Sequence, residues 1–400
     1  MTPATSQPAA QASILELDSE GRDSGVEAEN VQSDDAIVNP FDPRKIDVTT
    51  ETRTLDSLIK RLEIGQIDLD PDFQRSRGIW TPAKKSLLIE SLLLRIPLPT
   101  FYVAEIEDDA AFGEDRWAVV DGIQRLSTIA EFVAPKTIQL EPFRLTHLEY
   151  LESEEGKTFE DLSQALRLRI LESQFTCQVI RKSTPEPVQL NIFARINTGG
   201  VPLSAQELRH ALTPGPARLL LRNLAQASEF RCAVAESVSP SRMADREMVL
   251  RFLAFRLQDP LTYKSQDFNE FLRESMKAIN KWHETTVERA STEFSNAMIA
   301  SQAVFENDAF RKRYSTEDPR RPVSKALFEA VAVSIAAVAV DLGASGVQRL
   351  VDRRGKVKDS FIELMSDASF DRAISQGTGD PNRVRERFGK LLELMQGIAA

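Results

Sequence analysis

The chain has 400 residues, of which 42% are hydrophobic and 28% charged, a composition typical of a globular protein large enough for two domains. Its two cysteines lack metal or disulfide spacing, no apolar run reaches the roughly 18 residues of a membrane span, and no basic, apolar signal precedes the first domain. These features argue against secreted disulfide-rich and membrane proteins, so we expect a cytoplasmic protein with no membrane partner. The net charge of −10 argues against broad nucleic-acid binding but not against a local basic surface.

Three regions follow one another along the chain. Residues 1–44 hold nine acids and two bases with few apolar residues, which predicts a disordered acidic tail. This tail is either a solvated extension or a partner-binding or DNA-mimicking segment. Residues 45–212 alternate strands and helices, and residues 213–400 show helical periodicity almost throughout. The expected fold class is therefore α+β, a small mixed α/β domain followed by a mostly α-helical domain.

The elements of the α/β region are bounded by clear capping and turn residues. Thr81 followed by Pro82 is typical of a helix start, because an N-cap hydroxyl precedes proline at the first helical position. We expect helices over 55–63, 81–95, 123–132 and 159–171, and strands near 67–69, 101–106, 117–120 and 175–181. In the helical region the expected helices cover 216–225, 244–257, 267–282, 284–305, 323–342, 357–366 and 382–397.

The stretch from Trp117 to Ile129 is the most informative in the chain. An apolar run predicts a buried strand, Asp121-Gly122 predicts a sharp turn, and a helix follows with Gln124 and Arg125 in its first turn. The first N–H groups of a helix lack intrahelical partners and carry partial positive charge, so this geometry suits a phosphate. The alternative is structural: the carboxylate caps the helix and the arginine forms a surface ion pair.

A second segment, residues 189–209, contains a helix that ends at an Asn-Thr-Gly-Gly turn. Ser204 then begins a new helix with Glu207 three residues later, which predicts a capping box. Local structure accounts for these residues without any function. It does not account for Arg195 and Asn197.

Several common catalytic and nucleotide-binding motifs are missing from the sequence, which argues against the functions that depend on them. The three histidines share no motif, and the sequence has no G-x-x-x-x-G-K-[ST] loop and no G-x-G-x-x-G after a strand. His210 is expected on a helix surface. The remaining polar residues suit binding of a nucleotide or phosphodiester better than nucleophilic catalysis, and a carboxylate among them can hold Mg²⁺; they are Gln74, Arg75, Asp121, Gln124, Arg125, Arg195 and Asn197.

These motifs, in this order and over about residues 50–260, resemble the N-terminal domain of GmrSD-type restriction endonucleases, a GmrS-like family related to the ParB/sulfiredoxin fold. The signature D-G-Q-Q-R of that family is here Asp121-Gly-Ile-Gln124-Arg125. The other matching segments are Pro71-Asp-Phe73-Gln74-Arg75, Trp80, Ile96-Pro-Leu-Pro99 and Phe193 through Arg209.

The resemblance implies a ParB-like α/β domain that binds or hydrolyses a nucleoside triphosphate with Mg²⁺ in a prokaryotic restriction or anti-phage system. Asp121, Gln124 and Arg125 would be the catalytic residues, with Asp121 as the metal ligand. Gly122 and the four remaining polar residues would bind the nucleotide or its phosphates; these four are Gln74, Arg75, Arg195 and Asn197. A separate nuclease or defence protein would be the partner.

Two departures from the family pattern are visible. Ile123 replaces the first glutamine of D-G-Q-Q-R, which would weaken activity if that amide contacts the substrate. The histidine-rich nuclease domain expected of a partner is missing, so this chain alone is not expected to be the nuclease. Three hypotheses stay open: a nucleotide-binding and NTP-hydrolysing module, a DNA-binding or nicking protein that uses the same polar residues, and a non-catalytic scaffold.

Overall fold

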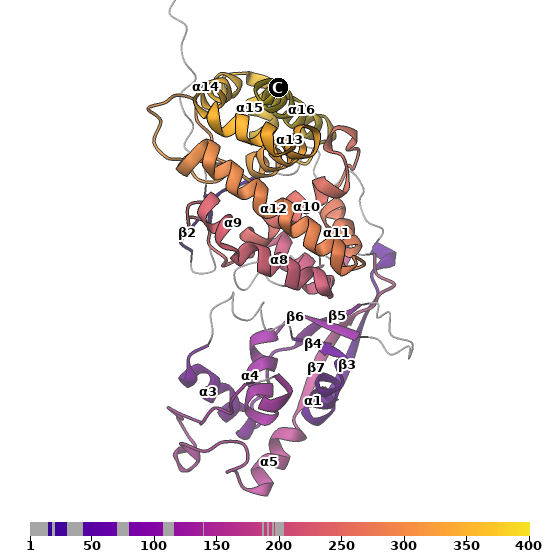
Figure 1. Cartoon of the computed structure of the whole chain (residues 1–400). Helices are drawn as coiled ribbons and strands as arrows, with labels where there is room; N and C mark the ends of the chain where they lie inside the picture. Colours follow the sequence, from indigo (N-terminus) through magenta and orange to yellow (C-terminus); the bar gives the residue numbers. More distant parts are fainter. Residues whose placement is uncertain are drawn as a thin grey trace, which may run out of the picture. The chain divides into compact units, whose positions relative to one another are not determined.

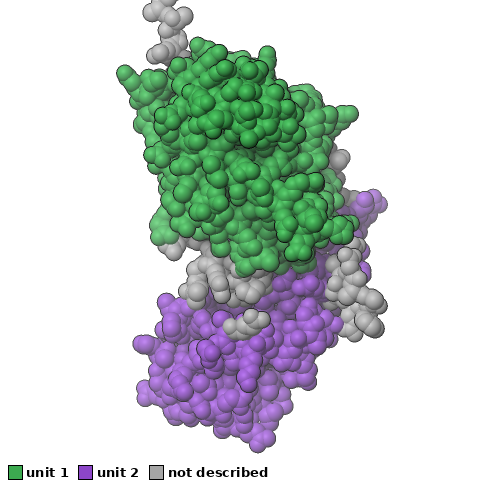
Figure 2. Space-filling model, in the orientation of Figure 1, with its two compact units in different colours: residues 1–38, 213–400 green, residues 39–212 purple. Residues whose placement is uncertain are grey.

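The structure is a computed structural model that describes residues 15–17, 21–29, 43–69, 80–106, 116–138, 140–185, 188–189, 192–193, 196 and 204–400. The chain divides into two compact units (Figures 1 and 2). The sheet unit comprises residues 39–212, and the helical unit comprises residues 213–400 together with residues 1–38. A mixed α/β part followed by a mostly helical part confirms the expected fold class.

The sheet unit contains one five-stranded mixed sheet. Its strands are β3 (Val48–Thr54), β4 (Ile67–Asp68), β5 (Phe101–Ile106), β6 (Arg116–Asp121) and β7 (Gln174–Ile180), in the order β3-β7-β5-β6-β4. β7 pairs antiparallel with β3 and parallel with β5, while β6 pairs antiparallel with β5 and parallel with β4. The carboxyl ends of β4 and β6 therefore lie at the same edge of the sheet.

The helices of this unit begin where their capping residues stand. The Thr81 hydroxyl accepts the N–H of Lys84 and confirms the predicted start of its helix. The expected 55–63 helix is present with the predicted bounds, and its buried residues recur at helical spacing. The helices are α1 (Leu55–Glu63), α3 (Pro82–Leu93), α4 (Ile123–Val133), α5 (Gln164–Leu171) and α7 (Ala205–Leu212).

Strand β3 is an element that the sequence analysis missed. Its sequence is Val-Thr-Thr-Glu-Thr-Arg-Thr, and its residues alternate between exposed and half-buried. β-Branched residues favour the strand, but no apolar alternation announces it because β3 lies at the sheet edge and none of its residues is buried.

The helical unit is built from nine helices among the described residues: α8 (Pro216–Gln226), α9 (Ser228–Ala233), α10 (Ala244–Leu257), α11 (Phe268–Ile279), α12 (Glu284–Phe305), α13 (Lys325–Asp352), α14 (Arg354–Met365), α15 (Ala368–Ser375) and α16 (Pro381–Ala399). The expected 244–257 and 284–305 helices have the predicted bounds, whereas α9 and α15 were not expected. Both are short, which leaves few turns over which an apolar period can be recognised.

Helices α10 and α13 form the centre of this unit. All residues of α10 from Ala244 to Phe255 are buried, and α13 packs against α10, α12 and α16. Among the described residues, α13 is the helix long and apolar enough to cross a membrane, but 67% of its most apolar window is buried inside the protein. The helix expected over 323–342 is thus a core helix, which continues past Gly343 through a kink.

Part of the acidic tail forms two strands. Within it, β1 (Leu15–Leu17) pairs antiparallel with β2 (Asp23–Glu27), and Val26 is completely buried in the helical unit. The prediction of disorder over residues 1–44 is therefore wrong for residues 15–17 and 21–29. The composition suggested disorder because the segment has few apolar residues, but its carboxylates find buried cationic partners that lie more than 200 residues away.

Candidate functional site

The candidate site lies at the carboxyl end of β6. The strand ends at Asp121, and Gly122 then turns the chain with φ +94°, a left-handed conformation that L residues rarely adopt. A Cβ on Gly122 would also lie 2.5 Å from the Phe101 ring. The N-terminus of α4 thus comes directly after a carboxylate, as the sequence predicted.

Arg125 holds this turn against the start of β5. Its guanidinium donates to the carbonyl oxygens of Pro99 and Thr100, stacks 4.7 Å from the Phe101 ring centroid and pairs with the Asp121 carboxylate at 3.1 Å. Only 13% of the Arg125 side chain is exposed, and burial lowers the pKa of the guanidinium although Asp121 opposes this shift. Arg125 therefore mainly stabilises the turn, and little of its side chain is accessible as a surface cation.

Asp121 and Gln124 are the accessible members of the D-G-x-Q-R motif. The Asp121 side chain is 39% exposed, and Gly122 is the N-cap residue of α4, so the expected capping position of Asp121 is wrong by one residue. Gln124 is half-buried. Ile123, in contrast, is only 4% exposed and packs in the core. The departure from D-G-Q-Q-R therefore falls on an interior position.

Strand β4, which precedes a second predicted segment in the sequence, runs parallel to β6. Ile67 is level with Trp117 and Asp68 with Ala118, so β4 leads the chain toward the end of the sheet that carries Asp121. Gln74 and Arg75 follow β4 but lie outside the described residues, as do Arg195 and Asn197 of the second motif.

The second motif ends in α7, which packs on β6, the strand that carries Asp121. α7 contacts β6, and the Ser204 hydroxyl accepts the N–H of Glu207 at 3.1 Å while the Glu207 carboxylate accepts the N–H of Ser204 at 2.6 Å. This confirms the predicted capping box. The prediction of a surface position for His210 is wrong, because that side chain is fully buried on α7.

One charged group of the sheet unit was not predicted. Arg181, just beyond β7, pairs with Glu51 of β3 at 2.9 Å and with Glu105 of β5. The Glu105 carboxylate contributes most to raising the pKa of Arg181. These residues lie far apart in sequence, and the pairing of β3 and β5 with β7 brings them together, so no local motif marks them.

The side chains present favour binding over nucleophilic attack. Mg²⁺ keeps several waters and takes one or two carboxylates plus substrate phosphates, so a half-exposed Asp121 suits a nucleotide-bound ion. No cluster of three or more histidine, cysteine or acidic side chains that could hold a metal by itself occurs among the residues that the structure describes. Burial raises the pKa of the Cys177 thiol to about 11, which leaves it without nucleophilic thiolate at neutral pH.

Comparison with known proteins agrees with the position of these motifs. Residues 55–213 match the family model described as GmrSD restriction endonuclease, N-terminal domain. The matched range includes the D-G-x-Q-R turn, β4 and the capping box that begins α7. No curated protein matches the chain.

Proposed function

We propose that the sheet unit binds and hydrolyses a nucleoside triphosphate in the cytoplasm. The match of residues 55–213 to the GmrSD N-terminal domain supports a component of a restriction or anti-phage defence system. The observation that carries the proposal is the half-exposed Asp121 carboxylate directly before the positive-φ Gly122 and the α4 N-terminus. This arrangement places an anion for a metal beside donors for a phosphate.

Each residue of the motif has a distinct part in this proposal. Asp121 would hold Mg²⁺ through its carboxylate, and the bound ion would neutralise phosphate charge. Gln124 would donate its amide to a phosphate oxygen or orient a water. Arg125 would act as a positioning residue, because its contacts to Pro99 and Thr100 fix the turn on which Asp121 stands.

The remaining polar residues of the two motifs complete the proposed pocket. Gln74 and Arg75 would join it because β4 leads toward the edge that carries Asp121, and Arg195 and Asn197 because α7 packs on β6. We also propose a ParB-like fold for the sheet unit, as the resemblance to the GmrSD N-terminal domain implies. DNA cleavage would belong to a separate nuclease partner, since only three histidines are present in the whole sequence.

The test is calorimetric titration of ATP, GTP, CTP and UTP with Mg²⁺ into the full chain, followed by phosphate release. Asp121→Asn should lower the Mg²⁺-dependent affinity at least about tenfold, equivalent to about 1.4 kcal/mol, and abolish turnover. Asp56→Asn is the matched control, because Asp56 also pairs with a cation four residues later on a helix of the sheet unit. Equal affinity of wild type and Asp121→Asn would refute the site.

DNA binding by the same residues is the competing function. It would need free cations at the surface, yet the Arg125 guanidinium is occupied by the two carbonyl oxygens and Asp121. A duplex oligonucleotide titrated in the same series separates the two functions. DNA binding that falls steeply with salt and is lost in Asp121→Asn and Gln124→Ala, without nucleotide binding, would replace the nucleotide proposal.

A further inference from the structure

The N-terminal segment, defined here as residues 15–17 and 21–29, is seated on the helical unit by its backbone. The N–H of Glu27 donates to the Val323 carbonyl at 2.8 Å, and the N–H of Val323 donates to the Gly25 carbonyl at 3.0 Å. Gly25 has φ +77°, and a Cβ there would lie 1.6 Å from the Ser237 carbonyl oxygen. The close fit requires glycine at this position.

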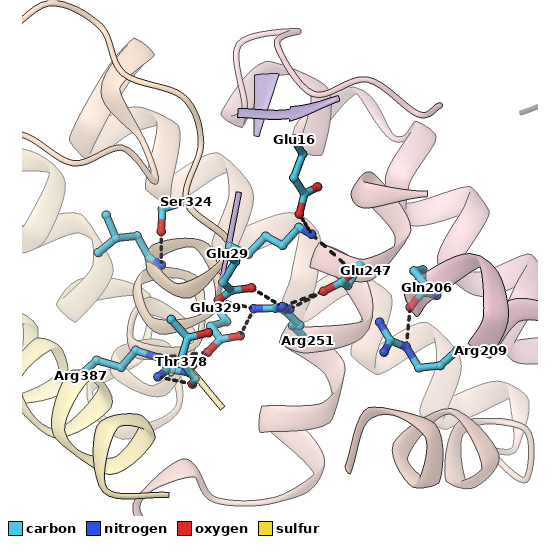
Figure 3. A network of polar contacts seen from close by, with 12 residues as sticks. Glu16, Glu29, Gln206, Arg209, Glu247, Arg251, Ser324, Glu329, Thr378 and Arg387 are labelled. Carbon is cyan, nitrogen blue, oxygen red and sulfur yellow. Dashed lines mark hydrogen bonds and ion pairs between the residues drawn. The ribbon is translucent and has the colours of Figure 1, made fainter. Parts of the chain in front are cut away.

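Three carboxylates of the N-terminal segment meet three cations of the helical unit, one to one. Glu16 pairs with Lys325 at 2.6 Å and Glu27 with Lys312 at 2.8 Å. Glu29 takes two hydrogen bonds from the Arg251 guanidinium, one of them at 3.1 Å. Figure 3 shows two of these pairs, in which Glu16 and Glu29 of the N-terminal segment point toward the helices. We call the three bases the cationic cluster; they are Arg251, Lys312 and Lys325.

The cationic cluster is only partly neutralised by the helices themselves. Glu247 accepts from Arg251 at 2.7 Å and lies 3.5 Å from Lys325, and Glu329 lies 3.3 Å from Arg251. Glu329 also pairs with the buried Arg387, so it serves two arginines. Without the N-terminal segment, Arg251, Lys325 and Arg387 would share these two acids, and Lys312 would lose its ion pair with Glu27. Because a buried cation without an anion is strongly unfavourable, these side chains require another anion in its place.

We propose that the cationic cluster is a binding site for the phosphates of a single nucleic-acid strand, and that the N-terminal segment is an acidic substitute that holds the site closed. The occupant in this structure is a pair of antiparallel strands, with Glu16 on β1, Glu27 at the end of β2 and Glu29 just beyond it. Glu27 and Glu29 stand two residues apart, about 7 Å in an extended chain. A planar arginine fork and two lysine ammonium groups are typical phosphate ligands.

The contacts favour a ligand recognised by charge. All three cations are engaged through side-chain carboxylates. The backbone of the N-terminal segment adds the bridge at Val26 and Val323 and one hydrogen bond from the Ser239 N–H to the Ser24 carbonyl. Arg251 is only 1% exposed with the N-terminal segment in place, so an anion reaches it only by displacing that segment. An acidic protein strand is the other occupant with this charge, and the experiment separates it from nucleic acid.

Two variants of the full chain open the site by different means. Replacing Glu16, Glu27 and Glu29 together by glutamine removes the carboxylates and keeps the backbone. Gly25→Val keeps every carboxylate but cannot seat the segment against Ser237. Both should bind a fluorescein-labelled oligothymidine at least about tenfold more tightly than wild type. With three phosphates neutralised, the slope of log affinity against log salt should steepen by about 2 relative to wild type.

Controls make the result specific to the cationic cluster. A triple variant that replaces the exposed Glu284, Glu288 and Glu363 by glutamine removes the same charge from the same unit and should bind like wild type. Adding Lys312→Gln and Lys325→Gln to Gly25→Val should remove the gain. In wild type, oligothymidine should speed amide exchange at Glu27, whose N–H is held by Val323. If circular dichroism shows that the opened variants do not fold, amide exchange at Glu27 in wild type tests whether oligothymidine displaces the N-terminal segment.

Two results would overturn the proposal. One is oligothymidine affinity that is the same in wild type, in folded opened variants and in the charge-matched control. The other is an opened site that binds a synthetic peptide of residues 13–31 but no oligothymidine, which would make the ligand an acidic protein strand. Because the variants lie in the helical unit and its N-terminal segment, either result leaves the nucleotide site at Asp121 untouched.

Discussion

The candidate site of the sheet unit and the core of the helical unit use charged side chains in opposite ways. At the candidate site the ion pair is local: Asp121 and Arg125 lie four residues apart in sequence, and the Asp121 side chain is 39% exposed. In the helical unit Glu329 joins Arg251 and Arg387 from other helices, and all three side chains are at most 1% exposed. A local, half-exposed acid remains available to a ligand, whereas a buried long-range network is committed to holding elements together.

The largest expected effect breaks the network of the helical unit. Glu329→Ala should destabilise it by about 3–5 kcal/mol, because Arg387 and Arg251 each lose a buried partner. Urea unfolding followed by circular dichroism measures the loss. Glu363→Ala on the exposed face of α14 is the control and should stay close to wild type. A cost for Glu329→Ala as small as that of the control would contradict the contrast between the units.

In the sheet unit, backbone conformation should matter more than charge. Gly122→Ala should cost about 2–3 kcal/mol, because alanine must adopt φ +94° and its Cβ would lie 2.5 Å from Phe101. Gly65→Ala is the matched control, since its φ is +76° and no atom lies within 4 Å of the added Cβ. The difference between the two variants measures the steric contact alone, and it should vanish if Phe101 moves away without cost.

Sequence patterns predicted the local features and missed the distant ones. The strand end at Asp121, the turn at Gly122 and the capping box at Ser204 each depend on residues within four positions, and each is present. The seating of the N-terminal segment depends on partners such as Lys325, about 300 residues away. No periodicity or motif encodes such a pairing, so composition alone suggested disorder there.

The Arg125 contacts were beyond prediction for a related reason. Its carbonyl acceptors belong to Pro99 and Thr100, which the antiparallel pairing of β5 with β6 brings beside the turn. From the sequence, the arginine could equally face a phosphate. The burial of His210 was missed because the segments that pack against α7 decide which of its faces is buried, and the sequence of the helix alone does not show them.

The attachment of the N-terminal segment should depend on pH in a defined direction. Burial favours the neutral form of Glu29, but Arg251 outweighs it and holds the pKa of the carboxyl below its ordinary 4.5. A depressed carboxyl pKa contributes stability above pH 4.5, which is lost as the pH falls through the folded-state value. Burial instead raises the pKa of Glu329, which repels Glu29 when ionised, so its protonation should first strengthen the attachment.

The Glu27 amide reports this change. Its protection factor, corrected for the intrinsic exchange rate, should rise slightly as the pH approaches 4.5 from above and then fall below it. Lys325, whose buried ammonium has a raised pKa because of Glu247 and Glu16 in spite of burial, stays charged throughout this range. In Glu29→Gln the fall at low pH should be absent, and a wild-type profile that stays flat would contradict the assignment to Glu29.

Asp121→Asn should change the free energy of unfolding least, although it should reduce nucleotide binding most. Asp121→Asn removes one half-exposed ion pair and should cost less than about 1 kcal/mol, because exposed pairs contribute little. Arg125→Ala should cost more, since it also loses two carbonyl contacts and the Phe101 ring. Thermal unfolding of both variants beside nucleotide titration separates the roles. If Asp121→Asn destabilises the sheet unit as much as Arg125→Ala does, Asp121 is a structural residue, and loss of binding would no longer identify it as a ligand to the metal.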